Sequence, residues 1–205
     1  LRTHSDTFTA SGRARSISKR ASTGERPSCR LMEPITRSDR WEVRLMILSQ
    51  KIAAALDENT HALTPPCVAS VDDGRNLLTL HLTAVDAVGL AFDSLEVKSR
   101  QRDHWSDDDI KSWGDRLSKR VTYLMEPLKV VELDTTEGEL QLRSEKPTLR
   151  AEKRGYYEVR ILRDGSLSLK RYLFDEQARS RAQAPCQMTR EVLERLADDI
   201  IASIP

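Results

Sequence analysis

The stretch YYEVRILRDGSLSLK, residues 156–170, indicates the class of fold that this chain adopts. Apolar and polar residues alternate on both sides of its Asp-Gly pair, which is typical of an antiparallel β-hairpin. A two-residue turn would place Ile161 opposite Ser168. A three-residue loop over 163–165, ending in a left-handed glycine, places Ile161 opposite Leu167 and gives both strands one apolar face. We therefore predict the three-residue loop.

A second hairpin is expected around Glu137 and Gly138. As a two-residue turn, this pair would place Leu133 opposite Leu142. The apolar side chains of both strands would then share one face of a sheet.

Three more strands are expected upstream of these hairpins. A short strand begins at Cys67, and residues 78–82 then alternate between leucine and a polar residue. The third strand carries an apolar pattern whose parity slips between Phe92 and Leu95, as a β-bulge would cause. Alternation with one polar face is typical of an antiparallel sheet.

Apolar residues at spacings of three and four predict three amphipathic helices. The first covers residues 38–57. The second begins after an N-cap at Ser106 and continues until Pro127 ends it. The third is capped near Thr189 and continues to Ile204.

The resulting order is α-β-β-β-α-β-β-β-β-α, which predicts an α+β domain. In it, an antiparallel sheet of six to seven strands carries three helices packed on it. Over residues 38–204 this order resembles the secretion-chaperone-like architecture, in which a helix, three strands, a helix, two strands and a helix form a small protein-binding module. The chain has one extra hairpin. The resemblance implies a homodimer that binds a protein partner.

The first 31 residues differ in composition from the rest of the chain. They contain seven basic and two acidic residues and no hydrophobic periodicity, so we expect them to be disordered. The composition changes at Met32, which we interpret as the natural start, with residues 32–205 forming one α+β domain. A basic tail that binds nucleic acid is the alternative.

The composition excludes several classes of protein. The longest uncharged stretch has 13 residues, from Asn59 to Val71, which is too short for a membrane-spanning helix. No two of the eight glycines lie closer than ten positions apart, so neither common phosphate-binding glycine loop is present and no cofactor is expected. Three widely spaced cysteines, with no C-x-x-C, fit the reducing cytoplasm.

The densest polar cluster in the sequence suggests a metal site. It consists of Asp103, His104, Asp107 and Asp108, whose imidazole and carboxylate groups are of the kinds that bind divalent metals. Acidic residues in the first turn of a helix also stabilise it through its macrodipole, which explains the cluster without a metal. A metal-dependent enzyme around His104 stays an alternative.

Residues 143–171 form the most basic part of the chain, with nine basic and four acidic residues. Basic side chains neutralise phosphates and aromatic rings stack on bases, so this segment and the aromatic residues up to 174 could bind single-stranded nucleic acid. A solvent-exposed sheet face with cross-strand ion pairs is the simpler alternative. The candidate residues are Arg143, Lys153, Arg154, Tyr156, Tyr157, Arg160, Lys170, Arg171 and Tyr172.

The leading hypothesis from the sequence is a non-enzymatic protein-interaction module, chaperone-like or adaptor-like, that forms a homodimer in the cytoplasm. No recognised catalytic set is present, whereas the amphipathic elements suffice for a scaffold. A chaperone-like binder should also expose an apolar strip beside its sheet.

Overall fold

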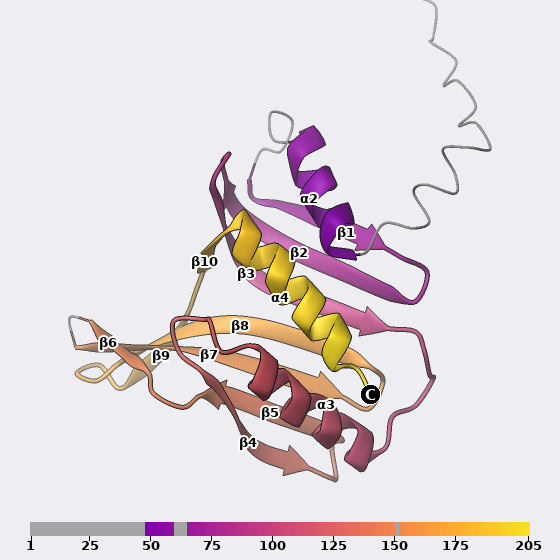
Figure 1. Cartoon of the computed structure of the whole chain (residues 1–205). Coiled ribbons are helices and arrows are strands. Elements are labelled where there is room, and N and C mark those ends of the chain that lie inside the picture. The colour runs from indigo at the N-terminus through magenta and orange to yellow at the C-terminus, as the bar shows by residue number, and fades with distance from the viewer. Residues whose placement is uncertain (1–47, 60–64, 151) are drawn as a thin grey trace, which may run out of the picture. The chain divides into compact units, whose positions relative to one another are not determined.

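The computed structural model describes residues 48–59, 65–150 and 152–205 (Figure 1). In this part of the chain, three helices cover one face of a ten-stranded antiparallel sheet. The α+β class and the order of the main elements are therefore confirmed. The predicted leader, residues 1–31, lies outside the described residues, as does the predicted start of the first helix at residue 38.

The helices are α2 (Leu48–Asn59), α3 (Asp107–Arg120) and α4 (Arg190–Ser203). Helix α4 lies between the other two and contacts both of them (Figure 1). Among the described residues, no helix combines the length and the apolar character that crossing a membrane requires.

The strands of the sheet follow the order β1-β2-β3-β8-β7-β5-β4, and the short strands β10, β6 and β9 pair with β3, β7 and β8. These three short strands raise the total above the six to seven expected. They were missed because each has only three to five residues. The bounds are β1 Cys67–Asp72, β2 Asn76–Val85, β3 Gly89–Ser99, β4 Leu128–Asp134, β5 Glu139–Ser144, β6 Thr148–Arg150, β7 Lys153–Leu162, β8 Ser166–Asp175, β9 Ser180–Ala184 and β10 Cys186–Thr189.

The three-residue loop between β7 and β8 is confirmed. Ile161 lies opposite Leu167 and Val159 opposite Leu169. Gly165 has a φ of 79°, in the left-handed region, and its N–H donates to the carbonyl of Leu162 at 3.0 Å. The hairpin therefore presents one apolar face to the helices.

The register predicted for the β4–β5 hairpin is wrong. Leu133 lies opposite Leu140, because the connection is a four-residue loop in which the Asp134 carboxylate accepts two backbone hydrogen bonds, at 2.8 and 3.0 Å. A register shift after Val130 then places that residue opposite Leu142. The bulge therefore turns Val130 and the buried Leu128 to the face on which Leu140 and Leu142 lie.

Helix α3 begins as predicted but ends earlier. Ser106 caps it through a capping box. The backbone leaves the helical conformation at Val121, so the helix ends at Arg120 and not before Pro127. Val121 and Leu124 are nevertheless buried. Their helix-like spacing therefore reflects packing of the following loop on the core.

Two other local predictions are confirmed. The bulge in β3 lies where the apolar parity slips, since Asp93 has no partner in β2 between the pairs made by Phe92 and Ser94. Thr189 caps α4 by accepting a hydrogen bond from a backbone N–H in its first turn.

The core lies between the helices and the sheet. Trp105 and Trp113 are both fully buried, with ring centroids 5.7 Å apart. Helix α3 approaches β5 so closely that a Cβ at Gly114 would lie 2.3 Å from a methyl carbon of Leu140. An alanine at that position would force the Leu140 side chain to move.

Replacing Gly165 tests the constraint on the β7–β8 loop. A Cβ there would lie 2.6 Å from Nε1 of Trp105 and 2.9 Å from the carbonyl oxygen of Ser99. Gly74 is a matched control, since its φ is 87° and a Cβ there would meet no described atom within 4 Å. We expect Gly165→Ala to lower the free energy of unfolding by about 2 kcal/mol more than Gly74→Ala, measured by urea denaturation. Equal effects would contradict this packing.

Candidate functional site

The pairing of β5, β7 and β8 divides the nine basic and aromatic candidates between the two faces of the sheet. Alternate residues of a strand point to opposite faces, so residues paired with each other share a face. The nine candidates therefore do not share one surface. On the open face, away from the helices, lie Arg143, Arg154, Tyr156, Arg160, Lys170 and Tyr172. On the helix-facing side lie Lys153, Tyr157 and Arg171.

A buried carboxylate organises the open face. The side chain of Glu158 is only 2% exposed, although it points away from the core. It accepts hydrogen bonds from Arg143 at 3.2 Å, Arg160 at 3.2 Å and Arg181 at 2.9 Å. Beside Glu158 and its three arginines lie one more cation, Lys170, and two tyrosine rings. We call the whole set the arginine cluster: Arg143, Tyr156, Glu158, Arg160, Lys170, Tyr172 and Arg181.

Two tyrosines complete the arginine cluster. Tyr156 and Tyr172 stack with ring centroids 5.9 Å apart. The guanidinium carbon of Arg181 lies 3.5 Å from the Tyr172 centroid, and that of Arg143 lies 5.3 Å from the Tyr156 centroid. Guanidinium groups therefore cover both rings, and cation–π attraction holds them there.

The charges of the cluster support one another. Burial raises the pKa of Glu158, but the hydrogen bond from Arg181 and the charges of Arg181, Arg160 and Arg143 outweigh it, so the pKa is lowered. Burial lowers the pKa of Arg181, and Glu158 more than offsets this effect. Glu139 also approaches Arg160, at 3.5 Å. When Glu139 is counted with the cluster, four cations and two carboxylates give a net charge of +2.

A shallow hollow opens at this cluster. It has a volume of about 260 Å³ and lies between Arg160, Lys170 and Tyr172, above Glu158. A hollow with cationic walls and fixed guanidinium groups can receive carboxylate or phosphate oxygens. The arrangement therefore offers binding of an anionic group.

Sequence reasoning missed the two central members of the cluster. Glu158 is one of the four acidic residues in the basic segment 143–171 and was not among the candidates, and Arg181 lies beyond the end of that segment. Arg181 belongs to β9, which pairs with β8 and so brings it onto the open face. The alternation of long polar and small residues in β9 was the available signal.

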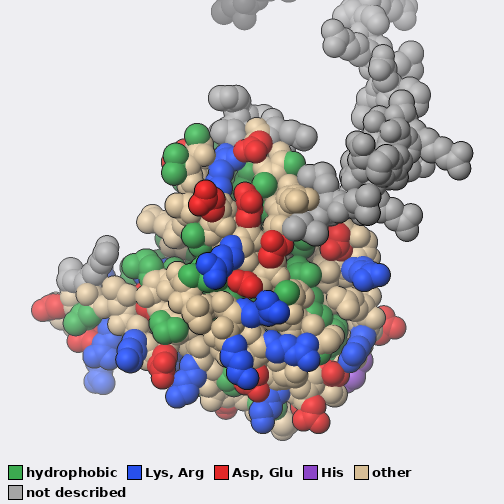
Figure 2. All heavy atoms as spheres, in the orientation of Figure 1, with side chains coloured by type: hydrophobic (Ala, Val, Ile, Leu, Met, Phe, Trp, Pro, Cys, Tyr) green, Lys and Arg blue, Asp and Glu red, His purple; other side chains and the backbone are tan. Residues whose placement is uncertain are grey.

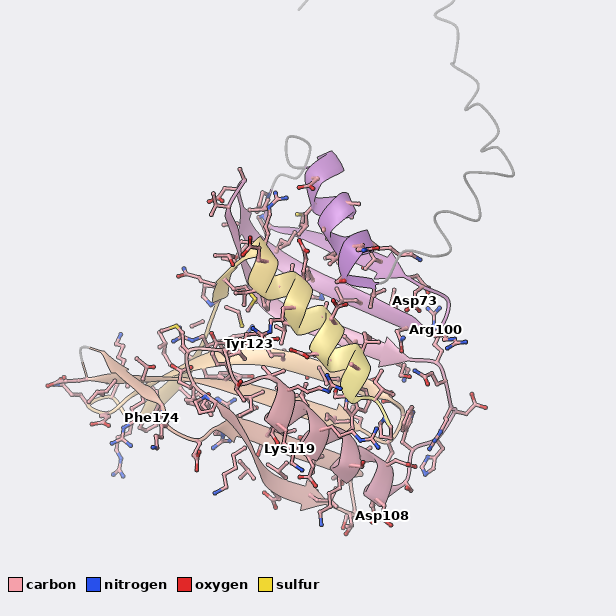
Figure 3. The ribbon with its side chains drawn as sticks, viewed as in Figure 1. Asp73, Arg100, Asp108, Lys119, Tyr123 and Phe174 are labelled. Carbon is pink, nitrogen blue, oxygen red and sulfur yellow. The ribbon has the colours of Figure 1, made fainter. Side chains whose placement is uncertain are left out.

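The residues of the predicted metal site do not gather into a set of metal ligands. Asp107 receives two hydrogen bonds from Arg163, each 2.7 Å long. Asp103, His104 and Asp108 are exposed, and Asp108 lies near the start of α3 (Figure 3). Within residues 48–59, 65–150 and 152–205, no three His, Cys, Asp or Glu groups gather in a way that could hold a metal ion.

Among the described residues, the large exposed apolar side chains come from five different segments. Val68 lies on β1 and Val131 on β4, the strands at opposite ends of the sheet path. On the helix face, hydrophobic side chains are interspersed with charged ones (Figure 2). The other exposed apolar residues are Val88, Met125 and Leu149.

Replacing Glu158 tests the charge balance of the arginine cluster. Because the folded pKa of Glu158 lies below its ordinary value of 4.5, the ionised carboxylate stabilises the fold fully above that pH. This contribution is lost as the pH falls through the lowered pKa. We expect Glu158→Gln to cost about 2 kcal/mol at neutral pH and less in acid, measured by urea denaturation across the pH range. Exposed Glu137→Gln is the control. A cost independent of pH would refute the assignment.

Compared with known proteins, the chain matches no family model, no curated protein sequence and no solved structure. No activity, ligand or partner therefore comes to it from a relative. The function has to follow from its own surfaces, among which the arginine cluster is the most highly organised.

Proposed function

We propose that this protein is a non-enzymatic interaction module that binds an acidic segment of a protein partner on the open face of its sheet. The observation that carries the proposal is the arginine cluster, in which one buried carboxylate holds three guanidinium groups. The cluster keeps a positive charge on a sheet face that no described helix covers.

Pre-organisation makes such a cluster suitable for binding. A free arginine side chain loses considerable rotamer freedom when it binds a ligand. Glu158 fixes Arg143, Arg160 and Arg181 during folding, so less freedom remains to be lost on binding. Each guanidinium has five N–H donors, and Arg143 and Arg181 each use one of theirs on Glu158.

A protein partner fits this surface better than a single-stranded nucleic acid. Binding of bases by stacking needs open aromatic faces. Here Arg181 lies over Tyr172, and Arg143 and Arg181 lie beside Tyr156, which is 8% exposed. Carboxylates, in contrast, bind guanidinium groups edge-on and leave these stacks intact.

In this proposal the protein recognises its partner through charged side chains, as an adaptor would. It does not use an exposed apolar strip, as a chaperone would. The exposed apolar residues are spread over five segments, which does not favour a single apolar binding strip. We place the interaction in the cytoplasm, where the unpaired thiols of Cys67 and Cys186 would stay reduced.

We further propose that the protein forms a homodimer through β1. This strand ends the sheet path, and its six pairs with β2 run without a register shift, so its outer edge can pair with another strand. The strand at the other end of the path, β4, is interrupted by a register shift beside Val131. Bulges of this kind hinder edge-to-edge pairing.

Lysine substitutions on the two edges test the dimer. Val68 on β1 is 56% exposed and Val131 on β4 is 54% exposed, so the two positions are closely matched. We expect native mass spectrometry to show a dimer for the wild type and for Val131→Lys, and a monomer for Val68→Lys. A monomeric wild type, or a Val68→Lys variant that stays dimeric, would contradict the proposal.

Removing two charges tests the binding surface. We expect Arg160→Gln with Lys170→Gln to weaken binding of a fluorescein-labelled polyglutamate peptide roughly tenfold, or about 1.4 kcal/mol, in fluorescence anisotropy at low ionic strength. The control combines Lys111→Gln with Lys119→Gln on exposed positions of α3, where Figure 3 marks Lys119. It removes the same charge from the helix side and should bind like the wild type.

The same titration with labelled oligothymidylate separates the two classes of partner. Tighter binding of oligothymidylate, lost in the Arg160→Gln, Lys170→Gln variant, would assign the surface to nucleic acid. Equal losses in the cluster variant and in the α3 control would show that only net charge matters, and would reject a defined site.

A further inference from the structure

A second hollow lies on the helix-facing side of the sheet, separate from the arginine cluster. Its volume is about 250 Å³. It lies where β7 and β8 extend beyond the helices toward β6 and β9, the end of the sheet on which Figure 3 marks Phe174 (Figure 1). Three of the basic and aromatic candidates line this hollow, because the strand register directs them away from the open face. They are Lys153, Tyr157 and Arg171.

No described residue accepts a hydrogen bond from the guanidinium group of Arg171. Its side chain is 18% exposed, and it forms no hydrogen bond with any described residue. Within the described part of the chain, its one ion pair is with Glu126, at 3.7 Å. Buried or nearly buried donors are almost always paired, and arginine carries five of them. This group is therefore placed to bind an acceptor from outside the chain.

The surrounding residues fix Arg171 in this position. Its guanidinium carbon lies 5.5 Å from the ring centroid of Tyr157. Glu126, only 1% exposed, attracts the group from the buried side, and neither carboxylate oxygen has a hydrogen-bond partner among the described residues. Gly155 leaves the space that the group occupies, because a Cβ there would lie 2.7 Å from a terminal nitrogen of Arg171. A larger residue at 155 would displace the guanidinium.

The other walls indicate the kind of ligand. Lys153 supplies a second cation at the rim, 3.8 Å from Asp175 and half exposed. Burial raises the pKa of Tyr157 to about 12, so its hydroxyl stays neutral and can donate a hydrogen bond. Leu173 and Met125 add apolar surface. These walls complement an oxyanion attached to a short apolar body.

We propose that this hollow binds a small organic anion, whose carboxylate or phosphate oxygens contact Arg171 and Lys153 and whose apolar part lies against Leu173. The hollow is slightly smaller than the roughly 300 Å³ at which drug-sized pockets begin, which limits the ligand to about the size of a single ring. Glu126 is a positioning residue that acts through Arg171. This site is independent of the proposed protein-binding surface.

Isothermal titration calorimetry on the full chain tests the site with three probes: benzoate, phenyl phosphate and inorganic phosphate. We expect saturable binding of at least one probe. Gly155→Ala, which displaces the guanidinium without removing its charge, and Lys153→Gln should each weaken binding by about fivefold or more. Arg154→Gln removes the same charge from the neighbouring residue on the open face and should leave binding unchanged.

The pattern of probes identifies the ligand chemistry. Binding of benzoate alone supports a carboxylate ligand, and binding of phenyl phosphate, with or without inorganic phosphate, supports a phosphate ester. The proposal is overturned if no probe saturates, if Gly155→Ala and Lys153→Gln both bind like the wild type, or if Arg154→Gln weakens binding as much as they do. Circular dichroism of each variant confirms that it is folded.

Discussion

The register of the β7–β8 hairpin is the constraint on which the other features of this protein depend. It directs Val159 and Ile161, with their partners on β8, toward the helices. Shifting one strand by a single residue would turn Glu158 and Arg160 into the core, and burying unpaired charges there would cost several kcal/mol. Gly165 fixes the register, because its left-handed conformation closes the loop in the narrow space beside Nε1 of Trp105.

The same alternation gives the sheet two chemically different faces. Neighbours in sequence serve different surfaces: Lys153 lines the hollow on the helix side, whereas Arg154 lies on the open face. Tyr156 and Tyr157 are separated in the same way. A basic segment that looks continuous in the sequence therefore becomes two separate groups of cations, each next to its own buried carboxylate, Glu158 or Glu126.

These two carboxylates differ in how well they are satisfied. Glu158 accepts hydrogen bonds from three arginines and is a stable centre for a surface that can receive acidic groups. Glu126 has no hydrogen-bond partner among the described residues, and neither has the Nε of Arg171 beside it. Unsatisfied buried groups cost free energy, so their position next to a hollow favours the proposed ligand, whereas both oxygens of Glu158 already accept hydrogen bonds.

The sequence by itself determined the α+β class, the order of the main elements, the β7–β8 loop and the caps at Ser106 and Thr189. All of these follow from periodicity and from contacts between residues close in the chain. Only the tertiary structure decided the register of β4 with β5, the end of α3 and the pairing of β9. It also brought Arg181 to Glu158, which lies 23 residues away. Such contacts depend on which strands become neighbours, and short-range patterns do not encode that choice.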